Sequence, residues 1–311
     1  MKPIRIGTRG SKLALYQAHH IAGLLENRGM KSETVVIDTT GDKIQNVSIA
    51  KIGSKGVFTQ ELEDQLETGD IDIAVHSAKD MQSSLPEGFE LIAFSEREKV
   101  NDIILSHQPR IIYDNPNLPL VIGTSSTRRI ATLKHFFPHI KTVEMRGNLQ
   151  TRISKMESGV CDALLLAYAG VHRMEYDHMI RQILPADVFI PAVGQGSIAV
   201  EAHAALDPGL RKKIREAAHH EETGYRLQAE RSFLKVLEGG CSIPVFALGK
   251  VLGQQLSLEG GVLSLDGSKR VCFEVHGTVD EAEEMGQQLA HKVLQADGRQ
   301  MLDEIKKTLG K

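Results

Sequence analysis

The stretch LVIGTSSTRRIATLKHFF, residues 120 to 137, contains a strand, a loop and a helix in succession. Residues 120–124 form a short apolar run with β-branched side chains, which is typical of a strand buried in a sheet. Residues 128–137 repeat apolar side chains at helical spacing and predict an amphipathic helix. Between the two lies Ser125, a residue type that favours helix N-caps. The stretch therefore predicts one β–α unit.

The same alternation continues through about residue 200. Further strands are expected in the β-rich runs 4–7, 34–38, 71–76, 91–94, 142–146 and 163–167. Further helices are expected in the amphipathic stretches 13–26 and 58–67. Strands that alternate with helices are typical of βαβ units, so this part of the chain predicts mainly parallel sheets.

The pattern changes after about residue 220. A predicted helix, 225–238, precedes strand-like segments at 243–252, 254–259, 262–266 and 270–276, and a long helix at 281–295 follows. At 311 residues the chain exceeds the usual size of one domain. We therefore expect an α/β protein with two βαβ-type domains and a ligand cleft between them, as in periplasmic binding proteins, plus a smaller α+β C-terminal domain.

The expected domain boundaries follow from these patterns. The first α/β domain comprises 1–97 and 196–217, the second comprises 98–195, and the C-terminal domain comprises 218–311. The charged segment SEREKVND, residues 95–102, is the expected crossing between the two α/β domains.

Composition narrows the class of protein. Hydrophobic residues make up 41% and charged residues 25%, an ordinary globular composition, and a net charge of −3 argues against a general binder of nucleic acid or anionic membranes. No apolar run reaches membrane-spanning length and the first residues lack a signal-peptide core, so we expect a cytoplasmic protein. Three cysteines at wide spacings fit neither a disulfide framework nor a zinc site, and we expect no metal.

Cations and hydroxyls gather where the predicted strands end. In open α/β sheets ligands bind at this edge, where loops lead into helix N-termini. The residues in such positions are Arg9, Ser11, Lys79, Asp80, Ser125, Arg128, Arg129, Arg146, Gly147, Arg152 and Arg173, with Lys55 in a glycine-flanked loop. Singly, each arginine is expected to be a solvated charge, and Ser11 and Ser125 are expected to be helix caps. Together they predict a site for a ligand that carries several carboxylates or phosphates.

Three of these residues are the most informative. Arg128 and Arg129 lie in the first turn of a predicted helix, where cations oppose the helix macrodipole, and an anionic ligand would remove that mismatch. Asp80 is the one carboxylate among the cationic loops. It is either a helix cap or ion-pair partner, or an ionised group that stabilises positive charge on a substrate.

Two sequence features do not predict a site. Residues 194–199, GQGSIA, match a dinucleotide-binding pattern, but they precede an apolar run instead of following a strand and opening a helix. The histidines show neither HExxH nor Cys/His ligand spacing.

Seven motifs resemble one known family. They are RGSKLAL (9–15), GSKGVFTQELE (53–63), HSAKD (76–80), GTSSTRR (123–129), RGNLQTRI (146–153), PAVGQG (191–196) and LEGGCSIP (237–244). In this order and over nearly the whole chain, they resemble the porphobilinogen deaminase (hydroxymethylbilane synthase) family. Ala78, Gln82 and Thr127 depart from its pattern, where Leu, Pro and Leu are expected, but none of these departures changes a charged or thiol position.

The resemblance implies a transferase of tetrapyrrole and heme biosynthesis. Such an enzyme deaminates four porphobilinogen molecules, condenses them head to tail on a covalent dipyrromethane primer, and releases hydroxymethylbilane by hydrolysis. Cys241 matches the cysteine that carries this cofactor through a thioether. Cys161 and Cys272 lie in strand-like runs and are expected to be small buried hydrophobes.

The resemblance also implies roles for individual residues. Asp80 matches the carboxylate that contacts pyrrole nitrogens and stabilises the azafulvenium cation formed when ammonia leaves. Cofactor contacts are implied for Cys241, Lys79, Asp80, Ser125, Arg128, Arg129, Arg146, Gly147 and Gln195. Substrate contacts are implied for Arg9, Ser11, Gln17, Lys55, Arg146, Arg152 and Arg173.

Two other classes of protein are compatible with the residues alone. A two-domain receptor without catalytic activity would share the architecture and would not need Cys241. An enzyme with a cysteine nucleophile would need a histidine within reach of that thiol. Apart from porphobilinogen, we expect no nucleic-acid or membrane partner, and we expect a monomer.

Overall fold

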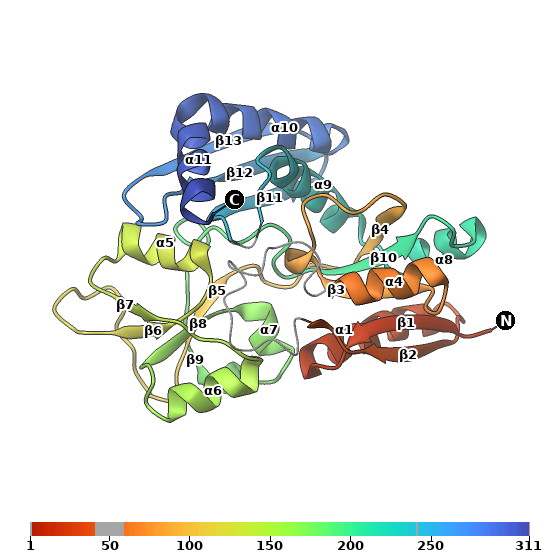
Figure 1. The fold of residues 1–311 in the computed structure, drawn as a ribbon, viewed down its shortest axis with the longest axis horizontal. Helices are drawn as coiled ribbons and strands as arrows, with labels where there is room; N and C mark the ends of the chain where they lie inside the picture. The colour runs from red at the N-terminus through yellow and green to blue at the C-terminus, as the bar shows by residue number, and fades with distance from the viewer. Residues whose placement is uncertain (1, 41–58, 241, 311) are drawn as a thin grey trace. The chain divides into compact units, whose positions relative to one another are not determined.

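The computed structural model describes residues 2–40, 59–240 and 242–310, and these form two five-stranded sheets and one three-stranded sheet (Figure 1). The chain divides into two compact units, Met1–Glu98 with Gly194–Leu227 and Lys99–Val193 with Gln228–Lys311. The mixed α/β class with a small C-terminal sheet domain is therefore confirmed. The first boundary between units falls within the expected crossing at 95–102. The three-domain boundaries stay a prediction.

The sheet of the first unit has the strand order β2-β1-β3-β10-β4. Its strands are β1 (Ile4–Arg9), β2 (Ser32–Ile37), β3 (Ile73–Ser77), β4 (Phe89–Phe94) and β10 (Ile198–His203), and its helices are α1 (Lys12–Glu26), α4 (Gln60–Thr68), the short 3-10 helix η1 (Ala78–Asp80) and α8 (Pro208–Ala218). β1 pairs in parallel with β2 and β3, whereas β10 pairs antiparallel with β3 and β4.

Amphipathic helices cover both faces of this sheet. On α1, Ala18, Ile21 and Leu25 recur at helical spacing and pack with α8 on the apolar face of β1, β3 and β10. On α4, Leu62 and Leu66 pack on the opposite face, against the buried Ala74 of β3. β1 and β3 are parallel neighbours, so their carboxyl ends lie beside each other at the same edge of the sheet.

The α/β sheet of the second unit has the order β7-β6-β8-β5-β9. Its strands are β5 (Asp102–Leu105), β6 (Val121–Gly123), β7 (Lys141–Val143), β8 (Ala163–Ala167) and β9 (Ile180–Ile183), and its helices are α5 (Thr127–Phe136), α6 (Leu149–Glu157), α7 (Tyr168–His172) and the 3-10 helix η2 (Asp177–Met179). Leu133 of α5 packs on one face of this sheet, and Ile153 and Met156 of α6 pack on the other.

The expectation of mainly parallel sheets is only half right. In each five-stranded sheet two strand pairs are parallel and two are antiparallel, because β10 and β5 run against their neighbours. β10 re-enters the first sheet after a long excursion, and β5 follows the crossing between units. Apolar periodicity shows that a strand is buried but carries no information about its direction.

The C-terminal sheet is an antiparallel meander of β11 (Val245–Leu252), β12 (Gln255–Leu263) and β13 (Arg270–Thr278). Its helical elements are α9 (Glu221–Val236), the 3-10 turn η3 (Val279–Glu281), α10 (Ala282–Val293), the π-helical turn η4 (Leu294–Gly298) and α11 (Arg299–Thr308). The predicted segments 254–259 and 262–266 are one strand, β12. The glycine pair 260–261 suggested a break, but a Cβ on Gly261 would collide with the Val271 carbonyl oxygen, so the pair permits close strand packing instead.

The turn between β12 and β13 docks on α5. Lys134 donates to the Leu265 carbonyl at 3.1 Å, and the His135 imidazole donates to the Gly267 carbonyl at 2.7 Å. Gly267 has a φ of +76°, and a Cβ there would lie 2.6 Å from the Lys134 Cβ. The contact fixes the helix that carries Arg128 and Arg129 relative to the C-terminal sheet.

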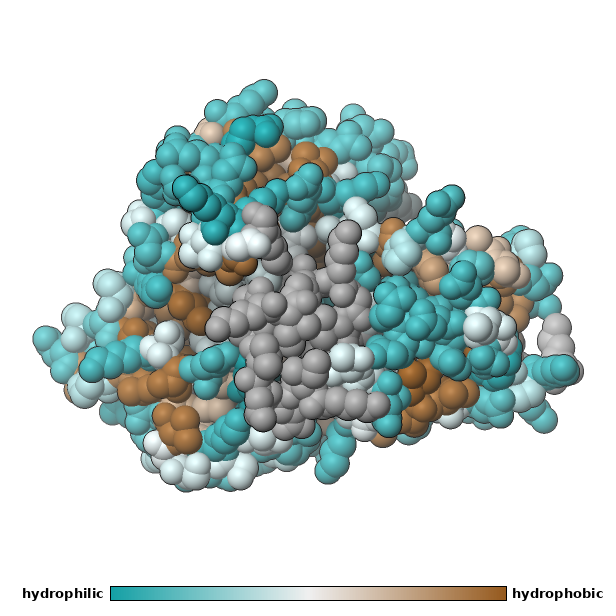
Figure 2. All heavy atoms as spheres, viewed as in Figure 1, coloured by the Kyte–Doolittle hydropathy of each residue, from teal (hydrophilic) through white to brown (hydrophobic). Residues whose placement is uncertain are grey.

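Hydrophilic residues cover much of the face drawn in Figure 2, and hydrophobic residues appear there as separate patches. No helix in the described ranges is long and apolar enough to cross a membrane.

Candidate active site

A pocket in the first unit lies where β1 and β3 end. Four residues that the sequence marked as candidates, Arg9, Ser11, Gln17 and Asp80, line it together. Its other polar lining comes from Thr59, His76 and Ser77. Arg9 is the last residue of β1, and Asp80 is the last residue of η1, the short turn that continues β3. The strand-end rule thus placed a cation and a carboxylate in one pocket.

The polar groups behind this pocket are held in place. Ser11 is the N-cap of α1 and accepts a hydrogen bond from the Ala14 amide at 3.2 Å, as the helix-cap interpretation predicts. Gln17 is only 3% exposed, and its amide donates to the Ser77 hydroxyl at 2.8 Å. Because Gln17 lies on α1 and Ser77 on β3, this bond joins the helix to the strand end that leads to Asp80.

Asp80 is neither a cap nor an ion-pair partner. The N-cap of η1 is Ser77, and Asp80 is the third residue of that turn. Its side chain is exposed and makes no hydrogen bond or ion pair in the part of the chain that the structure describes. A carboxylate without a partner in the described ranges, in a pocket that an arginine also lines, favours the functional interpretation over the structural one.

The second unit holds a buried ionic cluster at the start of α5. Arg128 and Arg129 are 4% and 6% exposed, and both pair with the fully buried Asp102 of β5, at 2.8 and 2.7 Å. Arg129 also donates to the Leu165 carbonyl, and Arg128 donates to the Ile190 carbonyl. The anion that the helix-dipole argument required is therefore partly supplied by the chain itself.

The described residues place two guanidiniums and one carboxylate in this cluster. Burial opposes ionisation of Asp102, but Arg128 and Arg129 outweigh it and hold the pKa of the carboxyl well below its usual range. Burial lowers the pKa of Arg128, while Asp102 opposes that shift. Among the described residues two guanidiniums face one carboxylate here, and within the same part of the chain the buried Arg128 Nε has no hydrogen-bond acceptor. Such a donor fits a carboxylate ligand.

The remaining candidates of the second unit lie around two loops. Ser125 is not the cap of α5; that role belongs to Ser126, whose hydroxyl accepts from the Arg129 amide at 3.5 Å. Ser125 instead links to the backbone of Met145, with its hydroxyl donating to the carbonyl at 2.9 Å and accepting from the amide at 3.0 Å. These two hydrogen bonds hold the loop after β6 against the segment that follows β7.

Arginines flank the glycine that follows β7. Arg146 donates from Nε to Glu144 at 2.6 Å, and Arg152 donates from Nε to the Gly147 carbonyl at 2.8 Å. Gly147 has a φ of +109°, a conformation that favours glycine. Arg173 caps the C-terminal end of α7. All three arginines are partly exposed, unlike Arg128 and Arg129.

Two candidates lie beside these sites and two lie outside the described residues. Lys79 is partly exposed and precedes Asp80, and Gln195 is buried, with its backbone carbonyl accepting from Arg97 at 2.9 Å. Lys55 and Cys241 are not among the described residues.

Cys161 is buried as expected, whereas Cys272 is only partly buried and donates to Glu259 at 3.7 Å. Burial raises the pKa of the Cys272 thiol to about 11, so it is a poor source of thiolate.

Sequence reasoning missed buried ionisable groups at both sites. They are Asp102 and the pair formed by His76 and Glu201, whose side chains meet at 3.0 Å. The available signal was an acid within or at the edge of an apolar strand, as in DIIL (102–105) and SIAVEA (197–202). A buried acid requires a partner, but the sequence does not name it.

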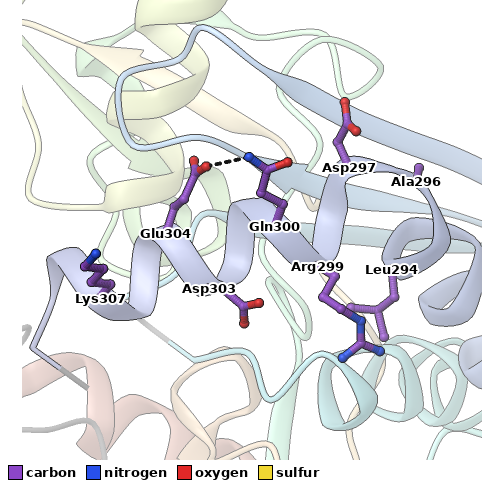
Figure 3. Close-up of a pocket in the computed structure, with 8 residues that line it drawn as sticks. All are labelled: Leu294, Ala296, Asp297, Arg299, Gln300, Asp303, Glu304 and Lys307. Carbon is purple, nitrogen blue, oxygen red and sulfur yellow. Dashed lines mark hydrogen bonds between the residues drawn. The ribbon is translucent and has the colours of Figure 1, made fainter.

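A second hollow lies on the C-terminal helices, lined by side chains of η4 and α11. Figure 3 shows Gln300 and Glu304 on one side of α11, joined by a hydrogen bond of 2.9 Å, and Arg299 and Asp303 on the other. None of the predicted site residues that the structure describes lines this hollow. Its side chains diverge, so it carries no functional assignment.

Comparison with protein families identifies the chain. Residues 4–208 match the family model described as "Porphobilinogen deaminase, dipyromethane cofactor binding domain". Residues 225–295 match the model of the porphobilinogen deaminase C-terminal domain. The chain belongs to the porphobilinogen deaminase family. These proteins are transferases of tetrapyrrole biosynthesis, so the resemblance seen in the motifs is confirmed, and a receptor without catalytic activity is excluded.

Similar proteins named porphobilinogen deaminase cover the chain from end to end. One from Cytophaga hutchinsonii is 53% identical over 311 residues, which are 100% of this chain and 99% of that protein. Another, from Desulfosudis oleivorans, is 51% identical over 98% of each chain. A third, from Synechococcus elongatus, is 41% identical over 98% of this chain and 96% of that protein.

Among solved structures, the VFT2 domain of Bordetella pertussis BvgS is 15% identical, with a TM-score of 0.43 over 69% of this chain and 85% of that one. The substrate-binding protein of an amino acid ABC transporter is 14% identical, with a TM-score of 0.39 over 70% of this chain and 91% of that one.

Proposed function

We propose that this chain condenses four porphobilinogen molecules head to tail on a dipyrromethane bound covalently to Cys241, and releases the tetrapyrrole hydroxymethylbilane by hydrolysis. The observation that carries the proposal is the pocket that joins Arg9, Ser11 and Gln17 to Asp80, whose carboxylate has no partner among the described residues. This pocket pairs groups that bind anions with one that stabilises a cation, and the reaction needs both.

The described residues fit a dipyrromethane. Each pyrrole of such a group carries an acetate and a propionate, so the ligand is a chain of carboxylates. The buried Arg128 Nε has no acceptor among the described residues, and the cluster contains two guanidiniums and one carboxylate from that part of the chain. Arg128 and Arg129 are the residues that would hold cofactor carboxylates, with Ser125, Arg146 and Gly147 on the adjoining loops. When bound, the cofactor supplies a nucleophilic pyrrole carbon to which the first substrate is joined.

The remaining chemistry belongs to side chains of the pocket. Arg9 binds a substrate carboxylate by charge-assisted hydrogen bonds, and Ser11 and Gln17 add neutral ones. Binding from several sides fixes the aminomethyl carbon against its acceptor, which supplies the proximity contribution. When ammonia leaves the substrate, an azafulvenium cation remains, and the Asp80 carboxylate stabilises it.

The test removes the negative charge of Asp80 while keeping the size of its side chain. Asp80→Asn should keep the unfolding free energy within about 0.5 kcal/mol, because the side chain has no hydrogen bond or ion pair with any described residue, and should lower single-turnover rates by ~10². Asp80→Glu keeps the charge one methylene away and should retain more activity. Loading by intact mass, melting temperature and single-turnover elongation are measured for each.

Asp303→Asn is the matched control, because Asp303 is an exposed helical aspartate without a described partner. It should change none of these quantities. Near-normal elongation in fully loaded Asp80→Asn would refute the role given to Asp80.

A further inference from the structure

A buried histidine–carboxylate pair lies in the wall of the same pocket. His76 of β3 lines the pocket together with Asp80, and its side chain is 5% exposed. Its Nε2 lies 3.0 Å from Oε2 of Glu201, a residue of β10 with a fully buried side chain. The two strands are antiparallel, and the register pairs Ala199 with His76 and Glu201 with Ala74. His76 and Glu201 are therefore diagonal neighbours on one face of the sheet.

This pair fixes the proton positions on the imidazole. A carboxylate only accepts hydrogen bonds, so Nε2 carries the proton and Nδ1 carries a lone pair. Nδ1 makes no hydrogen bond in the part of the chain that the structure describes, and it is not among the atoms sealed from solvent. A carboxylate that orients an imidazole, with the second nitrogen left as a base, is the arrangement of an activated proton acceptor.

Charged groups on neighbouring elements surround His76. Glu201 faces His76 from β10, and Glu63 approaches it from α4. Burial is the main cause that raises the pKa of Glu63, which favours its neutral form, and Gln82 donates to this carboxyl at 3.3 Å. Asp80 and Arg9 line the pocket itself. Of these acidic groups, Glu201 is the one in hydrogen-bond contact with the His76 imidazole, at 3.0 Å.

We propose that His76, oriented by Glu201, is the group that removes the proton released in each condensation; this inference rests on the proposed function. The methylene carbon of the azafulvenium bonds to the free α-carbon of the terminal pyrrole. The C–H bond at that α-carbon then breaks, its electron pair restores the aromatic ring, and the proton goes to His76 Nδ1. One ammonia and one proton leave for each unit added, so the step balances without another reactant.

The division of labour with Asp80 follows from the two environments. Asp80 is exposed, and its negative charge is needed while the cation exists. Proton removal requires a base that gains a proton in one cycle and loses it before the next. An imidazole does this near neutral pH, and a buried carboxylate behind it stabilises the charge that it gains.

The test uses porphobilinogen deuterated at its free α-carbon, because a ring added in one cycle loses this hydrogen in the next. In the wild type we expect little isotope effect on elongation. His76→Gln should lose ~10² in rate and should show a clear primary isotope effect, because hydrogen removal becomes the slow step. Glu201→Gln keeps a hydrogen-bond acceptor but loses the charge, and it should show a smaller loss with an isotope effect in the same direction.

A second readout does not depend on turnover. Nitrogen NMR of the labelled protein should find the Nε2–H tautomer of His76 in the wild type, as the bond to Glu201 requires. His276→Gln is the matched control, since His276 lies near Glu274 at 3.7 Å on β13 but is 69% exposed. It should leave the rate and isotope effect unchanged.

The outcomes separate the two proposals. If the wild type neither carries a dipyrromethane nor releases ammonia from porphobilinogen, the proposed function fails. If the wild type does both but His76→Gln elongates at the normal rate, or slows without any isotope effect, only the role of His76 is overturned. If His76→Gln does not fold, the isotope effect of Glu201→Gln decides in the same way. An Nδ1–H tautomer would also overturn the inference.

Discussion

Replacing Asp102 with asparagine removes the carboxylate charge that pairs with two arginines at the start of α5. Asp102 is fully buried and pairs with Arg128 and Arg129 at 2.8 and 2.7 Å. Breaking a buried pair by removing one partner costs about 3–5 kcal/mol, because the other charges stay buried without compensation. For a unit of this size that corresponds to a loss of about 6–20 °C in melting temperature.

The matched control is Asp72→Asn. Asp72 also pairs with an arginine, Arg5, at 2.8 Å, but their side chains are 21% and 36% exposed. A pair this exposed to solvent contributes at most about 1 kcal/mol. The same chemical change should therefore have a much smaller effect at Asp72, which separates burial from simple ion pairing.

The pH dependence of the Asp102 effect has a definite sign. The pKa of Asp102 lies below its unfolded value, so its contribution to stability is fully present above the unfolded pKa of about 3.9 and is lost as pH falls through the folded one. The difference in unfolding free energy between wild type and Asp102→Asn should stay constant from neutral pH to about pH 5. It should shrink below about pH 4.

Urea unfolding followed by circular dichroism measures these differences, since the chain has no tryptophan. Hydrogen exchange of peptides from α5 shows whether the loss occurs in the second unit. Equal losses in Asp102→Asn and Asp72→Asn, or a pH-independent difference down to pH 2, would refute the reasoning.

Two further predictions concern the same unit and its contrast with the first. Arg129→Leu should impair cofactor loading, whereas Arg9→Leu should keep the cofactor but stall elongation; intact mass during substrate titration separates these results, and equal loading with normal elongation in both would contradict the division. Gly267→Ala should cost about 2–3 kcal/mol, because the turn has a positive φ and its Cβ would press on α5. Gly253→Ala, at a similar φ of +62° with no atom within 4 Å, should cost only about 1 kcal/mol, and equal losses in chemical denaturation would show that docking does not matter.

Sequence reasoning recovered what local rules determine. The β–α unit at 120–137 appears as β6 and α5, because apolar periodicity and caps act over a few residues. The strand-end rule brought Arg9, Ser11 and Asp80 to one pocket, because parallel neighbours end at the same edge.

What the sequence could not supply depends on pairing between distant segments. The antiparallel direction of β10 brings Glu201 to His76, 125 positions away, and β5 brings Asp102 to α5, 27 positions away. Arg128 and Arg129, which the sequence predicts to contact a ligand, are therefore partly neutralised by Asp102 of the same chain. The glycine pair in β12 likewise depends on a neighbouring strand, since it is the carbonyl of β13 that leaves no room for a side chain.

The most direct test of the central claim is the intact mass of the purified protein, followed by mapping of the modified peptide. We predict a mass excess equal to one dipyrromethane, a positive Ehrlich colour reaction, and attachment to the peptide that contains Cys241. Cys241→Ser should fold but have neither the excess mass nor turnover, because a hydroxyl supplies far less nucleophile than a thiol near neutral pH. Sustained turnover of porphobilinogen by unmodified Cys241→Ser protein would contradict the claim.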